Sequence, residues 1–206
     1  MSQTRALENY FRLELPSLKQ FALLLLGCSL FGFGSGLFLS SGLGISPWNV
    51  FHMGLSLQLG GTIGIWTVGV SMALLLLWIP LKEKIGLGTL VNSLIIGPMI
   101  DLTILLIPET SHFGLGLFYV LMGLAFVGFG SGLYITRNLG AGPRDGLMTA
   151  LGRRGVPIWI ARNSLEAAAL ILGIILGGKA GLGTAVFVFG IGPSVQFFLK
   201  KFGGRY

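Results

Sequence analysis

Charge is what this sequence lacks most. Only 10% of its residues are Asp, Glu, Lys or Arg, 53% are hydrophobic, and the mean hydropathy is +0.84. A soluble domain carries about a quarter charged residues. No such residue occurs from Gln20 to Leu81, from Phe113 to Thr136 or from Ala180 to Leu199. Each run can cross a hydrocarbon core of ~30 Å, which takes about 20 helical residues. The sequence therefore excludes a soluble domain and predicts an integral membrane protein.

Residues that carry catalytic or metal chemistry are also scarce. The single cysteine, Cys28, excludes an internal disulfide. The two histidines, His52 and His112, are isolated and have no metal-ligand spacing. No phosphate-binding loop, nucleophile motif or pair of catalytic acids is present. We therefore expect no enzyme activity, no catalytic residue, no cofactor and no metal site.

What the chain does contain is six apolar spans, and their composition favours an all-α protein over a barrel because no polar face alternates along them. They are expected at 20–41, 62–81, 86–107, 113–136, 157–178 and 181–199. Twelve basic residues fall on one side if both termini are cytoplasmic: Arg5, Arg12, Lys19, Lys82, Lys84, Arg137, Arg144, Arg153, Arg154, Lys200, Lys201 and Arg205. The other side receives only Lys179, and Arg162 lies within the fifth span.

This asymmetry predicts the orientation, since cytoplasmic loops carry the excess of Lys and Arg. We expect a multi-pass protein of the bacterial plasma (inner) membrane, with cytoplasmic segments at 1–19 and 200–206. The net charge of +7 reflects these loops and does not indicate nucleic acid. The expected partners are the lipid bilayer and a small solute, and a homodimer would be unsurprising at this size.

The chain repeats itself at an offset of about 96 residues. Gly32-Phe33-Gly34-Ser35-Gly36-Leu37 aligns with 128–133, and 43–49 aligns with 139–145. An offset of about 95 then matches Gly86-Leu87-Gly88-Thr89 with 181–184, and Ile96-Gly97-Pro98 with 191–193. Each repeat, 20–107 and 113–199, holds three spans. Because three is odd, the second repeat starts on the opposite side, which predicts two inverted halves, as in many secondary transporters.

A short helix is expected after the first span of each half, at 47–59 and 143–152. Ser46 reads as an N-cap followed by Pro47 at the first helical position, and Gly142 takes the same place before Pro143. Gly44 and Gly140 supply the tight turn before each helix. Whether these helices re-enter the membrane or lie at its surface is left open.

The two Gly-x-x-Pro elements are the first candidate site. Helix N-termini in matching positions of inverted halves can bind an anionic or carbonyl group. The candidate solute-binding residues are Gly44, Ser46, Asn49, Gly140, Arg144 and Asp145. The alternative is that Asp145 only stabilises a helix N-terminus and that Trp48 is an interfacial anchor.

Ionisable residues within spans are the second candidates, because burying them is costly unless they are paired or face water. Asp101 lies in the third span, and Arg162 and Glu166 lie four residues apart in the fifth. We expect these three to be coupling candidates. The alternatives are a snorkelling Arg162 or an intrahelical salt bridge between Arg162 and Glu166.

The remaining glycines are expected to pack helices. Gly32 with Gly36, and Gly128 with Gly132, are pairs that let helices approach closely, and their equivalence suggests that spans one and four meet around the pseudo-axis. Gly97-Pro98 and Gly192-Pro193 are expected to kink spans three and six.

The glycine-rich blocks that end in Pro47 and Pro143, with the Gly-Leu-Gly-Thr and Gly-Pro motifs of the third span in each half, resemble the YczE/YyaS/YitT group of bacterial membrane proteins. The resemblance covers about 27–200. It implies a bacterial plasma membrane location, and it brings no substrate and no binding residues.

The leading hypothesis is a transporter of a small solute with an anionic or carbonyl group, working by alternating access between the halves. An aquaporin-like channel is a second hypothesis, although no Asn-Pro-Ala pair occurs. A non-transporting accessory or regulatory membrane protein is the third.

Overall fold

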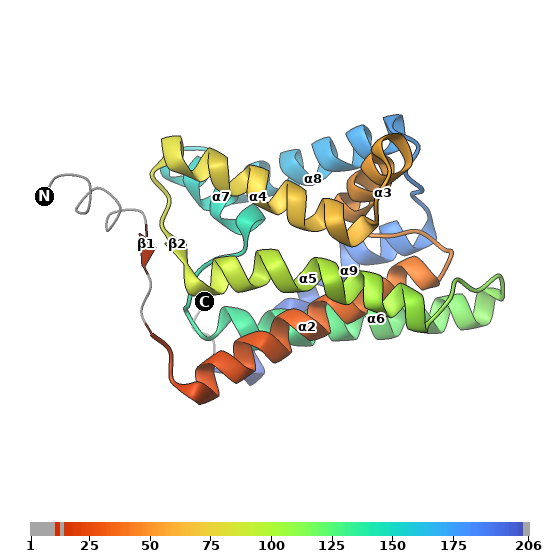
Figure 1. Ribbon diagram of the computed structural model, residues 1–206, viewed down its shortest axis with the longest axis horizontal. Helices are drawn as coiled ribbons and strands as arrows, with labels where there is room; N and C mark the ends of the chain where they lie inside the picture. Colours follow the sequence, from red (N-terminus) through yellow and green to blue (C-terminus); the bar gives the residue numbers. More distant parts are fainter. Residues whose placement is uncertain (1–10, 13–14, 204–206) are drawn as a thin grey trace, which may run out of the picture.

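The protein is built almost entirely from helices. The computed structural model describes residues 11–12 and 15–203, and Figure 1 shows its elements along the chain. The helices are α2 (Leu18–Ser40), α3 (Pro47–Leu59), α4 (Ile63–Leu81), α5 (Leu87–Leu106), α6 (Phe113–Ile135), α7 (Pro143–Arg153), α8 (Ile158–Ile175) and α9 (Leu182–Lys201). Two strands of two residues, β1 (Phe11–Arg12) and β2 (Ile85–Gly86), pair in parallel.

Six of these helices, α2, α4, α5, α6, α8 and α9, are long and apolar enough to cross a membrane. The prediction of an all-α protein with six such helices is therefore confirmed. Helix α8 ends at Ile175, three residues before the expected 178, where Gly177 takes a φ of +93° that a helix cannot continue. Most of the expected N-terminal segment 1–19 and the last three residues of 200–206 lie outside the described residues.

The local signals in the sequence set the helix starts. The Ser17 hydroxyl accepts a hydrogen bond from the Gln20 backbone N–H at 3.3 Å at the start of α2. Ser46 caps α3 in the same way, accepting from the Asn49 N–H at 3.4 Å, and Gly142 is the N-cap of α7. Both short helices begin with their prolines, as predicted. The strand pair β1–β2 was not predicted.

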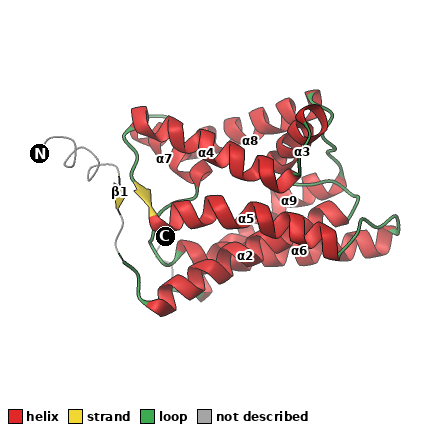
Figure 2. Ribbon diagram, in the orientation of Figure 1, coloured by secondary structure: helices red, strands yellow, loops and turns green. Residues whose placement is uncertain are grey.

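The helices form two layers, which Figures 1 and 2 show one above the other. In one layer α2 and α6 pack along each other at the centre, with α5 beside α2 and α9 beside α6. In the other layer α3 packs on α8 and α4, and α7 packs on the same two helices. The layers are joined where α4 lies against α5.

Glycines make the central contact between α2 and α6, but they are not the glycines that the sequence pattern indicated. A Cβ on Gly27 would meet the backbone of Gly130, and one on Gly34 would meet the backbone of Gly123. Gly32 and Gly36 instead face Met99 and Thr103 on α5. In the second half, Gly128 faces Ser194 and Gly132 faces Phe198, both on α9. Spans one and four do meet and these pairs do allow close packing, but they pack on α5 and α9, because residues two apart on a helix point to nearly opposite sides.

The turns before the short helices also fix the layers to each other. Gly44 has a φ of +111° and Gly140 a φ of +129°, so both need glycine. The Leu43 carbonyl just before the first turn accepts a hydrogen bond from the Gly183 N–H of α9 at 2.7 Å. The Leu139 carbonyl accepts one from the Gly88 N–H of α5, also at 2.7 Å.

Candidate functional site

A large cavity lies between the two layers, with a volume of about 1020 Å³. All eight helices of the described residues contribute to its wall, and its polar members come mainly from α4, α6, α7, α8 and α9. The polar and charged lining residues are Ser46, Thr67, Ser71, Asn92, Ser131, Tyr134, Asn138, Arg144, Asp145, Thr149, Arg162, Glu166, Gln196 and Lys200. Apolar side chains such as Trp48, Met148 and Ile191 fill the rest, so the cavity can hold a solute with both polar and apolar parts.

The short helix α7 is fixed at both ends, which positions Arg144 and Asp145. The indole N–H of Trp78 on α4 donates to the Pro143 carbonyl at 3.0 Å, and the Trp78 ring lies against Gly146. At the other end Arg153 forms an ion pair with the buried carboxylate of Glu83. The first turn of α7 is therefore held at the cavity wall.

The first turn of α3 reaches the same cavity. Ser46 and Trp48 line it, and the guanidinium of Arg144 lies over the Trp48 ring with 4.6 Å between Cζ and the ring centroid. This is a cation–π contact, which attracts a cation to the ring face. Trp48 is 6% exposed. The Trp48 side chain is thus enclosed by the protein at the cavity wall.

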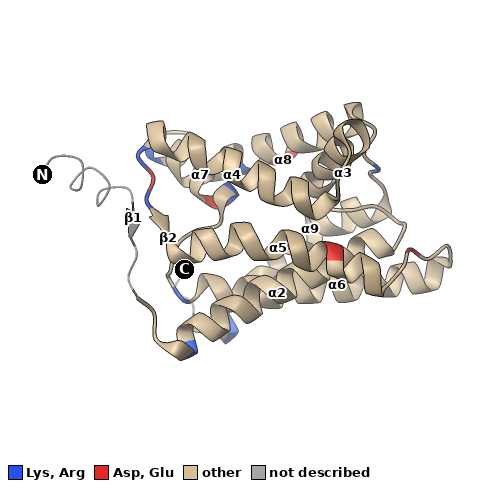
Figure 3. Ribbon diagram, in the orientation of Figure 1, with Lys and Arg blue, Asp and Glu red and all other residues tan. Residues whose placement is uncertain are grey.

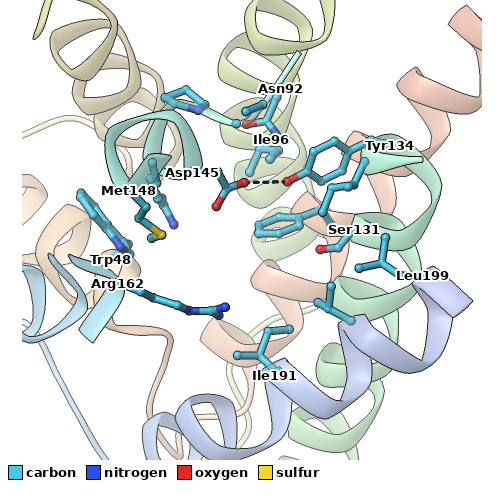
Figure 4. Close-up of a pocket in the computed structure, with 18 of the residues that line it drawn as sticks. Trp48, Asn92, Ile96, Ser131, Tyr134, Asp145, Met148, Arg162, Ile191 and Leu199 are labelled. Carbon is cyan, nitrogen blue, oxygen red and sulfur yellow. Dashed lines mark hydrogen bonds between the residues drawn. The ribbon is translucent and has the colours of Figure 1, made fainter. Parts of the chain in front are cut away.

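Asp145 and Arg162 extend into the cavity from α7 and α8, as Figure 4 shows. The hydroxyl of Tyr134 on α6 donates a long hydrogen bond of 3.5 Å to the Asp145 carboxylate. Enclosure by the protein raises the pKa of the Asp145 carboxyl, although the positive charges of Arg162 and Arg144 oppose the shift. Glu166, one turn after Arg162, lines the cavity beside it.

Four of the five charged residues of the cavity wall, those on α7 and α8, are not paired with one another. No ion pair joins Arg144 or Arg162 to Asp145 or Glu166, all of which the structure describes. The intrahelical salt bridge considered for Arg162 and Glu166 is therefore not formed. The cavity presents two positive and two negative groups that remain available to a solute.

The structure brings six of the nine sequence-predicted site residues to the cavity: Ser46, Gly140, Arg144, Asp145, Arg162 and Glu166. Three are placed elsewhere. Gly44 packs against Gly181 at the start of α9. Asn49 is 3% exposed and is not part of the cavity wall, although it aligns with Asp145. Their roles in solute binding stay predictions.

Asp101 is the third residue outside the cavity, and it joins α5 to the first turn of α4. Its carboxylate accepts a hydrogen bond from the Thr62 hydroxyl at 2.5 Å and one from the Gly64 N–H at 2.8 Å. A carboxylate in this place also interacts favourably with the N-terminal end of the helix dipole. A role of Asp101 in coupling stays a prediction. We call Asp101, Thr62 and Gly64 the α4–α5 latch.

Sequence reasoning missed several cavity residues that the structure adds, among them Tyr134, Asn92 and Gln196. Asn92 and Gln196 could have been found, because a polar amide in an apolar span is a signal of an internal site. Thr67 and Ser71, four residues apart on α4, give a similar signal. Tyr134 gave none, since a tyrosine near the end of a span also fits an interfacial position.

These features define the class: a helical membrane protein with six long apolar helices and a charged cavity between two layers. The chain belongs to a family described as a "Family of unknown function (DUF6198)", which matches residues 18–200. It is 44% identical over 184 residues to an uncharacterized protein of Haemophilus influenzae, covering 88% of this chain and 84% of that protein.

Two Bacillus subtilis proteins are also similar to it. An uncharacterized membrane protein, YczE, is 32% identical over 162 residues, covering 77% of this chain and 75% of the relative. The uncharacterized protein YyaS is 32% identical over 171 residues, covering 79% and 84%. The resemblance to YczE and YyaS is confirmed. No solved structure matches the chain.

Proposed function

We propose that this protein carries a small solute with an anionic or carbonyl group across the bacterial inner membrane, by alternating access between two inverted halves. The observation that carries the proposal is the cavity itself. A central cavity lined by unpaired Arg144, Asp145, Arg162 and Glu166 is costly in a membrane protein unless water or a solute compensates these charges. Transport needs no catalytic residue set, and the sequence shows no nucleophile motif or pair of catalytic acids. We therefore infer transport rather than catalysis.

Reciprocal contacts between the halves support the inverted repeat. Leu43 aligns with Leu139 and Gly88 with Gly183, and each leucine carbonyl accepts from the glycine of the other half at 2.7 Å. The contact of Gly27 with Gly130 is matched by that of Gly34 with Gly123. These are the pairings that a two-fold axis between the halves requires.

The axis itself would run near the cavity. Trp48 and Arg144 occupy equivalent positions in the two repeats, and they touch each other. Equivalent residues make contact only close to a two-fold axis. The N-terminal ends of α3 and α7 therefore converge on the site, as in transporters with interrupted helices.

One pair of contacts breaks the symmetry, and it indicates how access could alternate. Helix α4 packs on α5, where Gly64 lies against Gly97 and Asp101 closes the α4–α5 latch. The matching helices α8 and α9 make little contact. Gly192, the counterpart of Gly97, lines the cavity, and a Cβ added to it would meet open space.

Gln196, the counterpart of Asp101, also lines the cavity and makes no latch in the part of the chain that the structure describes. We infer that the structure is closed between α4 and α5 and open between α8 and α9. In the alternate state α8 would close on Gly192 while α4 leaves α5.

The charge distribution supports a cytoplasmic opening. Figure 3 shows Lys and Arg gathered at the end of the molecule where β2 and the C-terminal end of α4 lie. Lys200 on α9 lines the cavity at this end. With the basic end in the cytoplasm, the open side between α8 and α9 faces inward and the α4–α5 latch closes the outer side.

Solute flux tests the proposal directly. The purified protein is reconstituted into liposomes, exposed to a bacterial extract of small polar metabolites, and the vesicle contents are compared by mass spectrometry with protein-free liposomes. We expect at least one metabolite to accumulate or exchange with saturation, and this flux to be lost in Arg162→Ala. The matched control is Arg154→Ala, which removes an exposed arginine outside the cavity.

The same experiment separates the alternatives. Flux that never saturates indicates a channel. Flux equal to that of protein-free liposomes for every metabolite indicates an accessory or regulatory protein and refutes transport.

Labelling of cysteines tests the open side. In a Cys28→Ala background, Gly192→Cys should react with a membrane-impermeant maleimide in inside-out vesicles and be protected in right-side-out cells. Ser93→Cys on α5, where the native residue is 1% exposed, should stay unlabelled from either side. Labelling of Gly192→Cys from the outside only would contradict the orientation.

A further inference from the structure

The charges of the cavity wall are balanced, and this balance bears on which solutes can bind. Arg144 and Arg162 supply two positive groups, and Asp145 and Glu166 supply two negative groups. Lys200 adds a third cation, but it lies in the last turn of α9 at the exposed basic end. The inner wall therefore has no excess of one sign that would favour a simple anion or a simple cation.

The opposite charges are near one another without being joined. Arg162 and Asp145 both line the cavity, yet no ion pair connects these two described residues. Figure 4 shows the two side chains extending into the same space from different helices. A solute in that space can contact the guanidinium and the carboxylate together.

The neighbours of these groups explain why they stay apart. Arg144 is held over the Trp48 ring, and Asp145 is held by the Tyr134 hydroxyl. The first turn of α7, which carries Asp145, is held by the Trp78 indole through its hydrogen bond to the Pro143 carbonyl. The fold thus holds charges of both signs at the cavity wall and keeps them from forming an ion pair with each other.

From this arrangement we propose that the solute is a zwitterion, a small molecule that carries an anionic group and a cationic group together. The inference rests on the transport function proposed above and names the class of its solute. The Arg162 guanidinium binds the anionic group, and the Asp145 carboxylate binds the cationic group. The apolar wall around Met148 and Ile191 receives the body of the solute.

A solute with a single charge can pair with only one of the two wall groups. It displaces water from the other group and leaves that group without a partner. Such a group loses a charge-assisted hydrogen bond, which corresponds to roughly a 10- to 100-fold change in affinity. Discrimination between a zwitterion and its singly charged analogues is therefore the property that this wall predicts.

Matched sets of probes test this inference on the purified full chain in lipid nanodiscs, by calorimetry and by thermal stabilisation. The sets are glycine, acetate and methylamine; γ-aminobutyrate, butyrate and propylamine; and phenylalanine, phenylpropionate and phenethylamine. We expect a zwitterion of at least one set to bind at least about 10-fold more tightly than both of its analogues.

Two variants give the inference a signature that misfolding cannot imitate. Arg162→Gln should lose the preference for the zwitterion and bind the amine of that set as well as the zwitterion. Asp145→Asn should do the reverse and accept the acid. The controls Arg154→Gln and Glu109→Gln change the same charges at exposed positions outside the cavity, and they should keep the wild-type preference.

Binding of the acid, or of the amine, as tightly as the zwitterion by the wild type overturns the inference. Binding of none of the zwitterions also overturns it. In either case the transport proposal is judged separately by the metabolite flux described above, so the two can fail independently.

Discussion

Replacement of Asp101 by alanine removes the carboxylate of the α4–α5 latch. The lost contacts are the hydrogen bonds from the Thr62 hydroxyl at 2.5 Å and from the Gly64 N–H at 2.8 Å. A hydrogen bond to a charged group contributes about 1.5–3 kcal/mol, and the helix dipole adds about 0.3–1 kcal/mol. Asp101 is half-buried and water can replace part of these contacts, so we expect a loss of about 2–3 kcal/mol.

Thermal unfolding of the purified protein in detergent measures this loss. For a chain of this length about 1 kcal/mol corresponds to 2–4 °C, so the unfolding midpoint of Asp101→Ala should fall by roughly 5–10 °C. The control is Glu109→Ala, an exposed acid that follows the same helix, and its midpoint should not change.

A double-mutant cycle with Thr62→Val shows whether the contact itself is responsible. If the latch is formed, the double variant should lose clearly less than the sum of the single variants, because the two residues share one hydrogen bond. Additive losses, or an unchanged midpoint in Asp101→Ala, would refute the latch. They would also remove the support it gives to a closed outer side.

Other variants probe the helix contacts. Gly34→Leu should destabilise the protein by about 1–3 kcal/mol, because the new side chain meets the backbone of α6. The control Gly114→Leu lies on α6 where space is open, and it should not destabilise the protein. Gly146→Val should lower the midpoint by displacing the Trp78 ring, and solute binding should weaken with it because α7 shifts. Glu83→Gln should cost less than either, since its partner guanidinium is 66% exposed and such ion pairs contribute about 0–1 kcal/mol. Fluorescence-detected thermal unfolding checks all four, and an unchanged Gly34→Leu midpoint would contradict the packing described for α2 and α6.

Elements that depend on local sequence were predictable. Ser46 and Pro47 mark the start of α3, and Gly142 and Pro143 mark the start of α7, because capping and the fixed φ of proline act over a few residues. The long apolar helices follow in the same way from the length of uncharged runs. Arg162 and Glu166, which were singled out as charges in the fifth span, both line the cavity.

Side-chain direction was less predictable. Asp101 was grouped with Glu166 because both are acids in apolar spans, yet Asp101 contacts the first turn of α4 and Glu166 faces the cavity. The meeting of α2 with α6 was inferred from the repeated pairs that include Gly32 and Gly36, while Gly27 and Gly34 make the contact. The rotation of a helix about its axis is set by packing against its neighbours, and an apolar span without a polar face carries little record of it.

The sequence by itself determined that this is a membrane protein, where its helices lie, the repeated blocks and the two short helices. These features follow from composition and from contacts between near neighbours in the chain. Only the tertiary structure decided that Trp48 and Arg144 meet, that Asp145 and Arg162 share a cavity without pairing, and that α4 and α5 touch where α8 and α9 stand apart. Those features join residues distant in the chain, and their geometry depends on how closely the glycine faces allow the helices to approach.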